Sequence, residues 1–141
     1  MNNEIVLYDY EASPCARRVK ICLMEKGIPY KTQVIDLSKM EQKNPEYLRI
    51  NPNGLVPAIN HKGRVIFESS VIIAYLEDNF PKVKLSPKTS EGVIAAKKWE
   101  SYELAMANTY RTLMYESTMG PLQHIACTLD EFLSILSLIQ H

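Results

Sequence analysis

Short apolar runs separated by polar turns predict alternating strands and helices over the first half of the chain. Residues 5–8 form an apolar run of strand composition. Apolar positions then recur at helical spacing from Pro14, with Ser13 as the N-cap and Gly27 after the last turn. Residues 31–37 alternate loosely and predict a second strand, parallel to the first. The residues expected on the buried face of the helix are Ala16, Val19, Cys22 and Leu23.

The next segment is interrupted by turn residues and by a proline inside an apolar run. Residues 38–49 are polar and predict a loop with a short helix, and residues 51–54 form a turn cluster. The apolar run 55–59 contains Pro57, which has no N–H to donate to a sheet. We therefore expect Pro57 at the start of an edge-accessible strand, with the backbone of Val56 left to pair with a peptide-like ligand.

A hairpin and a further helix complete the first part of the chain. Residues 61–63 predict a hairpin turn, residues 65–67 a strand, and residues 71–79 a helix. The predicted element order is therefore β-α-β-α-β-β-α. The apolar positions of this helix are Val71, Ile72, Tyr75 and Leu76.

Helical periodicity resumes after a proline-containing linker at residues 81–90. Apolar residues then recur at spacings of three and four, which predicts one long amphipathic helix over residues 91–119. A second apolar helical pattern covers residues 122–139. Because two helices with apolar faces make a poor domain by themselves, we expect residues 91–141 to be an incomplete all-helical domain. It should leave an apolar patch open, formed by Trp99, Phe132, Leu133, Leu136 and Ile139.

Composition narrows the classes of function. The chain has 141 residues, 46% of them hydrophobic, which suffices for one compact domain or one domain plus part of another. Sixteen basic and sixteen acidic residues cancel, and no basic cluster is interleaved with aromatic residues, so the pattern favours a small molecule over nucleic acid or an anionic membrane. No apolar run reaches secretory or membrane-spanning length, so we expect a soluble, unexported protein. Three cysteines without metal-type spacing fit a reducing compartment, with no metal and no disulfide framework.

Cys15 is the first candidate for chemistry. In the first turn of the predicted helix, unpaired N–H groups and the positive end of the helix dipole favour a thiolate, and Arg17 and Arg18 add charge of the same sign. The alternative is structural: Ser13 caps the helix and Cys15 is a small core residue. Taken alone, the Ser-Pro-Cys pattern favours the structural interpretation, and motifs further along the chain reverse it.

Three motifs, at residues 13–19, 51–59 and 67–70, together resemble the N-terminal, thioredoxin-like domain of cytosolic glutathione transferases. The first motif is most similar to the Ser-x-Cys versions of the zeta class and of the bacterial tetrachlorohydroquinone dehalogenase-like branch. The resemblance implies an α/β thioredoxin-like domain at residues 1–80 and, after the linker, a partial all-α C-terminal domain. Family members continue for several more helices, which complete that second domain.

The resemblance also implies a set of binding residues for glutathione. The Val56-Pro57 bond would be cis, so that Val56 presents its backbone N–H and C=O to the cysteinyl unit. Glu68 would accept from the γ-glutamyl ammonium, and Ser69 with the amides at its helix start would hold the γ-glutamyl carboxylate. Gln42 matches a position that meets the glycine end. Without the resemblance, Glu68 and Ser69 would be interpreted as a charged surface residue and an ordinary N-cap.

Three functions are compatible with this sequence. The preferred one is a glutathione S-transferase-like enzyme, in which Ser13 stabilises the glutathione thiolate for attack on a small electrophile. The second is thiol exchange at Cys15, as in reductive dehalogenation or deglutathionylation. The third is a non-catalytic glutathione-binding or dimerisation module. We further expect a cytoplasmic homodimer. The residues expected to line the second-substrate side are Tyr8, Tyr10, Met106 and Tyr110.

Overall fold

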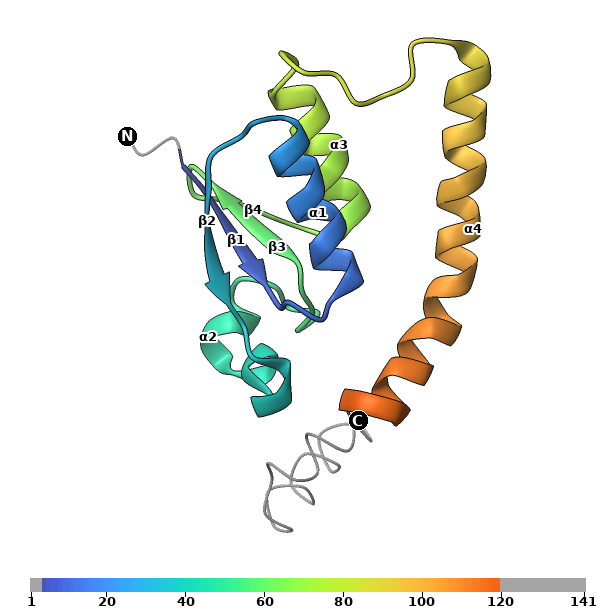
Figure 1. Cartoon of the computed structure of the whole chain (residues 1–141). Coiled ribbons are helices and arrows are strands. Elements are labelled where there is room, and N and C mark those ends of the chain that lie inside the picture. The colour runs from blue at the N-terminus through green and yellow to red at the C-terminus, as the bar shows by residue number, and fades with distance from the viewer. Residues whose placement is uncertain (1–3, 120–141) are drawn as a thin grey trace. The chain divides into compact units, whose positions relative to one another are not determined.

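The computed structural model describes residues 4–119, which contain a four-stranded sheet, helices packed on both of its faces, and a long separate helix (Figure 1). The described residues before Pro87, apart from Ser38–Met40, form one compact unit, and the others belong to a second. The first unit has the element order β-α-β-α-β-β-α that the sequence predicts. The thioredoxin-like fold class is thereby confirmed.

The sheet is mixed, with strand order β2-β1-β3-β4. β1 pairs in parallel with β2, where Ile5 lies opposite Tyr30, and antiparallel with β3, where Tyr8 lies opposite Ala58. β3 and β4 form an antiparallel hairpin in which Ala58 lies opposite Phe67. The strands are β1 (Ile5–Asp9), β2 (Tyr30–Val34), β3 (Ala58–His61) and β4 (Arg64–Phe67).

Helix α1 (Pro14–Glu25) forms as the sequence predicts. The side-chain oxygen of Ser13 accepts from the backbone N–H of Ala16 at 3.3 Å, which satisfies one of the unpaired donors of the first turn. Gly27, at φ +63°, follows the last turn in the left-handed conformation that glycine adopts without cost. The four residues predicted for the buried face of α1 are the ones that the structure buries.

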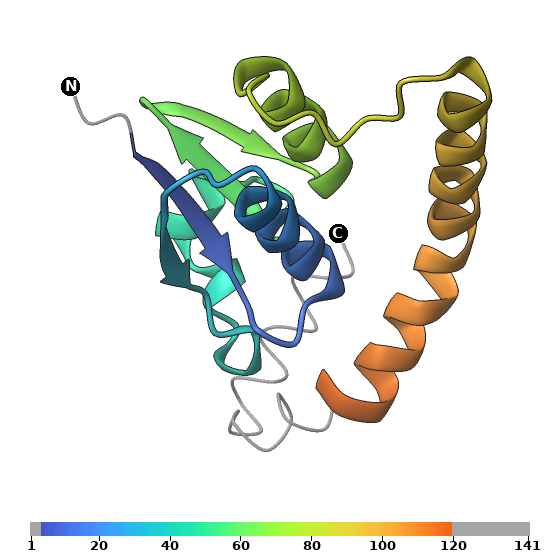
Figure 2. The same ribbon diagram turned by 45° about the horizontal axis from the view of Figure 1, so that its top comes forward.

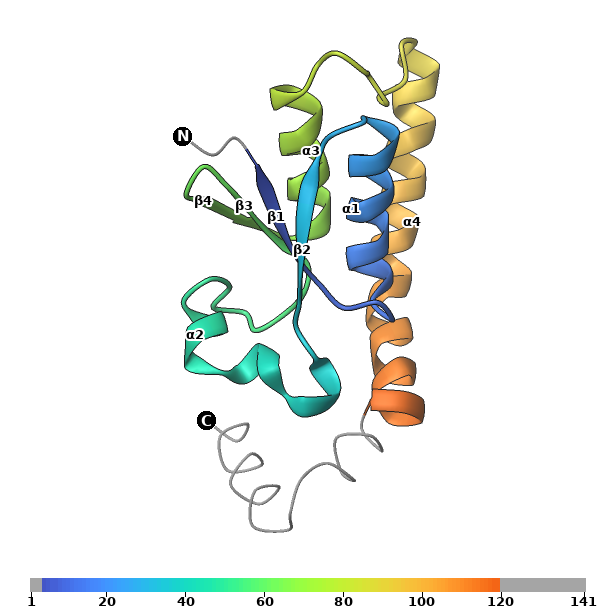
Figure 3. The ribbon, with the colours of Figure 1, turned by 60° about the vertical axis from the view of Figure 1, so that its left-hand side comes forward.

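Two apolar clusters fix the helices on opposite faces of the sheet. α1 and α3 (Ser69–Asn79) lie side by side on one face, as Figures 1 and 3 show. The short helix α2 (Pro45–Leu48) lies on the other face, where Tyr47 packs with Tyr8, Ile35 and Ala58. The buried cluster between the sheet, α1 and α3 consists of Ile5, Leu7, Val19, Cys22, Leu23, Ile28, Ile59, Ile72 and Leu76.

Three local predictions were wrong in detail. β3 is an inner strand, and the sheet tolerates Pro57 because Pro57 precedes Ala58, the first paired residue of β3. β2 ends at Val34, three residues before the predicted end, and it lies at one edge of the sheet, where Val34 is 65% exposed. α3 begins at Ser69, two residues before the predicted start, and Val71 is exposed on its outer side.

Helix α4 (Ser90–Met114) continues into a π-helical turn at Tyr115–Met119, within one residue of the predicted span. Several of its described apolar side chains are open to solvent: Trp99 is 72% exposed and Leu104 is 69% exposed. Within residues 4–119 no helix combines the length and the apolar character needed to cross a membrane. The second predicted helix, at residues 122–139, lies outside the described residues.

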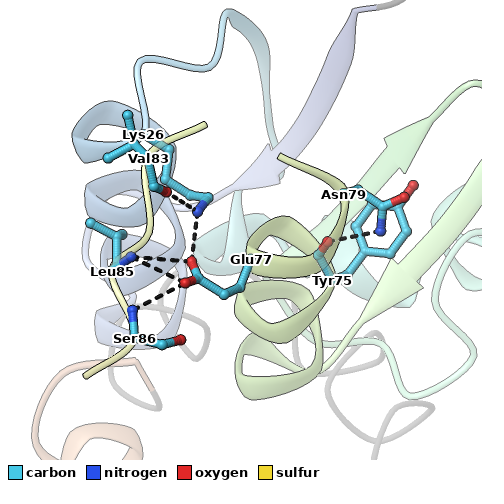
Figure 4. Close-up of polar contacts among 7 residues, drawn as sticks. All are labelled: Lys26, Tyr75, Glu77, Asn79, Val83, Leu85 and Ser86. Carbon is cyan, nitrogen blue, oxygen red and sulfur yellow. Dashed lines mark hydrogen bonds and ion pairs between the residues drawn. The ribbon is translucent and has the colours of Figure 1, made fainter. Parts of the chain in front are cut away.

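Lys26 makes a partly buried ion pair that the sequence pattern does not reveal (Figure 4). Its Nζ donates to Glu77 Oε2 of α3 at 2.6 Å and to the Val83 carbonyl oxygen at 2.5 Å, and its side chain is fully buried. Glu77 Oε1 accepts in turn from the backbone N–H groups of Leu85 and Ser86, each at 3.1 Å. These contacts fasten the segment after α3 to the C-terminal end of α1.

Donors from two sides also stabilise the charge on Glu77. The hydrogen bond from Lys26 is the largest cause, and the backbone N–H of Ser86 adds to it. Together they lower the pKa of the Glu77 carboxyl from 4.5 to about 2. A carboxylate at this position is therefore ionised throughout the neutral and mildly acidic range.

Replacing Lys26 with Met should lower the free energy of unfolding by roughly 3 kcal/mol, because Glu77 would keep its charge in a partly buried position without a cation. Urea denaturation followed by circular dichroism at neutral pH measures this loss. Lys31→Met is the matched control: its ion pair with Glu4, at 2.8 Å, is largely exposed, so the loss there should stay below about 1 kcal/mol. Similar small losses in both variants would contradict a stabilising role for Lys26.

Glu77 should also shape the acid limb of the stability curve. Its pKa is lower in the folded chain than the ordinary 4.5, so its contribution is fully present above that pH and is lost as the pH falls toward about 2. Glu77→Gln removes this titration, so the variant should lose less stability than the wild type between about pH 5 and pH 2. Unfolding free energies at a series of pH values test this. Parallel curves for the two proteins would rule it out.

Candidate functional site

The strand register brings three separate sequence motifs to one end of the sheet. β1 ends beside the first residues of β3, because Tyr8 lies opposite Ala58. β4 ends at the same place, because Phe67 also lies opposite Ala58. The segments 10–15, 55–57 and 68–70 therefore all lie next to one end of the sheet. It is the end to which the arrow of β1 points in Figures 1 and 2.

Ser13 and Cys15 lie where β1 passes into α1. The backbone N–H of Ser13 donates to the Tyr10 carbonyl at 2.9 Å, which closes a tight turn after the strand. The Ser13 hydroxyl oxygen accepts from Ala16, so the hydroxyl keeps its own hydrogen for a further acceptor. Cys15 is a free thiol of intermediate exposure. Cys22, further along α1, is buried, and burial raises the pKa of its thiol.

The Val56-Pro57 peptide bond is cis, as predicted. The carbonyl before it is held by two hydrogen bonds: Tyr47 Oη and Asn51 Nδ2 both donate to the Leu55 oxygen at 2.7 Å. Burial raises the pKa of Tyr47, which keeps its hydroxyl protonated as a donor. Both donors are buried, so the approach to Val56 is fixed from within the fold.

Tyr47 and Asn51 are functional candidates that the sequence interpretation missed. Asn51 is 1% exposed, and its Oδ1 also accepts from the backbone N–H of Asn53 at 3.1 Å. That contact is the local side-chain turn typical of asparagine, so the Asn-Pro-Asn-Gly motif carried a signal for it. No local pattern identifies Tyr47, because the carbonyl that it holds lies eight residues away.

Gly54 permits the close contact between this turn and the segment that carries Gln42. It has φ +59°, and a Cβ added there would lie 3.0 Å from the Gln42 carbonyl oxygen and 3.2 Å from the Leu48 side chain. Any larger residue would be strained both by its backbone conformation and by these neighbours. Gln42 itself is largely buried, at 8% exposure, in a short 3-10 turn.

Glu68 and Ser69 stand at the start of α3. Glu68 is exposed and has φ +68°, an unfavourable conformation for a non-glycine residue of the kind that clusters at binding sites. Asn53 Nδ2 contacts its carboxylate at 3.4 Å, which connects the turn before Val56 to this helix. Ser69 is 7% exposed, and its Oγ accepts from Arg18 Nε of α1 at 2.9 Å.

The residues expected on the second-substrate side are not brought together in the first unit. Tyr8 is buried and packs edge to face on Tyr47, with ring centroids 5.8 Å apart. Tyr10 is half-buried and contributes its carbonyl to the turn before α1. Met106 is exposed on α4, in the other unit, and the side chain of Tyr110 lies outside the described residues.

The chemistry of this sheet end suits a small zwitterion with a peptide backbone. The hydroxyls of Ser13 and Ser69 and the unpaired first-turn N–H groups of α3 are donors, and Arg18 adds a positive charge. Glu68 supplies one exposed carboxylate as an acceptor. Among the residues that the structure describes, no group of three or more His, Cys, Asp or Glu side chains could hold a metal ion.

Comparison with known proteins agrees with this geometry. The family model "Glutathione S-transferase, N-terminal domain" matches residues 12–79. A zeta-class glutathione S-transferase from Euphorbia esula is 36% identical over 87% of this chain and 49% of that protein, and a maleylacetoacetate isomerase from Dictyostelium discoideum is 34% identical over 87% and 52%. The crystal structure of a glutathione transferase homologue from Drosophila mojavensis with bound glutathione superposes with a TM-score of 0.73 and 31% identity, over 79% of this chain and 52% of that one.

The chain spans about half the length of these relatives. The family model runs from the turn before α1 through the end of α3, so it contains all three motifs that meet at the sheet end. One of the relatives named above is a zeta-class glutathione S-transferase and another is a maleylacetoacetate isomerase. Through this N-terminal domain, the chain belongs to the cytosolic glutathione S-transferase family and is similar to its zeta class.

Proposed function

We propose that the sheet end of the first unit binds glutathione and directs its thiolate to a small electrophilic substrate. The observation that carries this proposal is the convergence of segments 10–15, 55–57 and 68–70 at one end of the sheet. Glutathione has a peptide backbone, a carboxylate at each end and one ammonium group. The donors and the exposed carboxylate of Glu68 at this end of the sheet are complementary to those groups.

Each part of the tripeptide has a proposed partner. The cysteinyl unit pairs with the backbone of Val56, which Tyr47 and Asn51 fix through the preceding carbonyl. Glu68 accepts from the γ-glutamyl ammonium, and Ser69 donates to the γ-glutamyl carboxylate. We place Gln42 at the glycine end, since its turn packs against Gly54 beside the same loop.

Ser13 is the proposed catalytic residue. The glutathione thiol loses its proton to solvent. The Ser13 hydroxyl, whose hydrogen the helix cap does not use, then donates to the sulfur and stabilises the thiolate. The sulfur electron pair then forms a bond to an electrophilic carbon, and a leaving group such as halide departs with its bonding electrons. The relatives' names include both a transferase and an isomerase, so the proposal concerns thiolate attack on carbon and not one particular product.

Thiol exchange at Cys15 is the second candidate, favoured by the intermediate exposure of this thiol. In that reaction the Cys15 thiolate attacks oxidised glutathione, one new S–S bond forms, and one glutathione thiolate leaves. For the whole protein we also propose a cytoplasmic homodimer. The exposed apolar side chains of α4 are consistent with association, and this arrangement is typical of the family.

Substitutions at Ser13 and Cys15 distinguish these reactions. Ser13→Ala should reduce kcat/KM for conjugation of glutathione to 1-chloro-2,4-dinitrobenzene by roughly 10²-fold, because one donor to the thiolate is lost, whereas Cys15→Ser should change it little. Ser13→Asp is the control for folding, since aspartate caps helices as well as serine but its carboxylate has no hydrogen to donate to the sulfur; it should be folded and at least as impaired as Ser13→Ala.

The opposite pattern would assign the chemistry to Cys15. In that case Cys15→Ser would be impaired, and mass spectrometry after treatment with oxidised glutathione would find a stable adduct on Cys15. A wild-type chain that binds glutathione but shows neither reaction would instead support a non-catalytic binding module.

A further inference from the structure

We propose that Arg18 is a positioning residue that makes Ser69 selective for a carboxylate. This inference rests on the proposed function, because it concerns how the γ-glutamyl carboxylate of glutathione would be recognised. Arg18 lies in the Ser-Pro-Cys-Ala-Arg-Arg motif, where the sequence alone indicates only that it adds positive charge near Cys15. The structure places its Nε in hydrogen-bond contact with Ser69, 51 residues away in the sequence.

The contact joins two helices that pack on the same face of the sheet. Arg18 Nε of α1 lies 2.9 Å from Ser69 Oγ, at the first residue of α3. The Ser69 side chain is buried and Arg18 is half-buried. Both positions are set by the core, since Val19 beside Arg18 and Ile72 one turn after Ser69 belong to the same buried cluster.

The direction of this hydrogen bond determines what Ser69 can bind next. A guanidinium group has donors and no acceptor, so Arg18 must donate and Ser69 must accept. The serine hydroxyl then has its own hydrogen available for a ligand atom, and it acts as a donor. Ser69 is thereby set to recognise an acceptor such as a carboxylate.

Two further features favour a negative charge at the same place. The first intrahelical bond of α3 runs from the Ile72 N–H to the Glu68 carbonyl, so the N–H groups of the preceding first turn point out of the helix without intrahelical acceptors. The Arg18 guanidinium adds a full positive charge in partly desolvated surroundings, where charges interact more strongly than in water. Arg18 thus supports Ser69 electrostatically as well as by orientation.

The neighbouring Arg17 lacks these properties and provides the matched control. It is exposed, and its Nη2 contacts the Glu11 carbonyl oxygen at 3.4 Å, on the loop before α1. Arg17→Gln removes the same charge one residue away, so a loss of affinity seen only in Arg18→Gln cannot come from general electrostatic attraction of the anionic ligand.

The test uses isothermal titration calorimetry on the full chain with two ligands under reducing conditions. One is glutathione, and the other is 4-aminobutanoyl-cysteinyl-glycine, which has the same amine and peptide but lacks the γ-glutamyl carboxylate. We expect Arg18→Gln to weaken glutathione binding about tenfold or more, as loss of a charge-assisted contact would. The same variant should change binding of the analogue by less than about twofold, and Arg17→Gln should change neither ligand.

Arg18→Lys keeps the charge but not the planar donor, and should restore part of the lost affinity and of the discrimination between the two ligands. Circular dichroism and thermal unfolding of all variants report whether they are folded. The inference is overturned if the wild type binds glutathione and Arg18→Gln binds it as tightly. It is also overturned if Arg18→Gln weakens the binding of both ligands equally, because a purely structural contact between the helices would have that effect. If the wild type itself binds no glutathione, the proposed function fails, and this inference with it.

Discussion

The pairing of β1 along both of its edges is the constraint on which the rest of the structure depends. Parallel pairing with β2 requires a helical crossover, which places α1 on one face. Antiparallel pairing with β3 makes that strand begin where β1 ends, so the loops that carry Ser13, Val56 and Ser69 meet at one end of the sheet. A shift of one residue in this register would turn Ile5 and Leu7 away from the core, so the buried cluster and the site are specified together.

A small number of buried polar contacts then hold the loops in place. Tyr47 and Asn51 hold the carbonyl before Val56, and Lys26 with Glu77 holds the segment after α3. Each of these groups would cost free energy if it were buried without a partner. The fold therefore positions the candidate site with polar groups that are largely internal, and leaves Glu68 and the half-exposed Cys15 accessible to a ligand.

The sequence predicted the parts that depend on local patterns. The Ser13 cap, the buried face of α1, the cis bond before Pro57 and the element order are all observed. The edge position of β2 and the inner position of β3 were not predicted, because strand order is set by contacts far apart in the chain. For the same reason Tyr47, Lys26 and the contact of Arg18 with Ser69 were missed: each joins residues whose proximity exists only in the fold.

The central claim is that this sheet end, within the first unit, binds glutathione. Titration of reduced glutathione into the ¹⁵N-labelled chain, followed by two-dimensional ¹H–¹⁵N NMR, tests the claim residue by residue. The account predicts saturable shifts of the backbone amides of Ser13, Cys15, Ala16, Leu55, Val56 and the segment from Glu68 to Ser70. The opposite end of the sheet, at Lys62 and Gly63, should be unaffected. Shifts concentrated at the Lys62-Gly63 turn, or no shifts at millimolar glutathione, would contradict it.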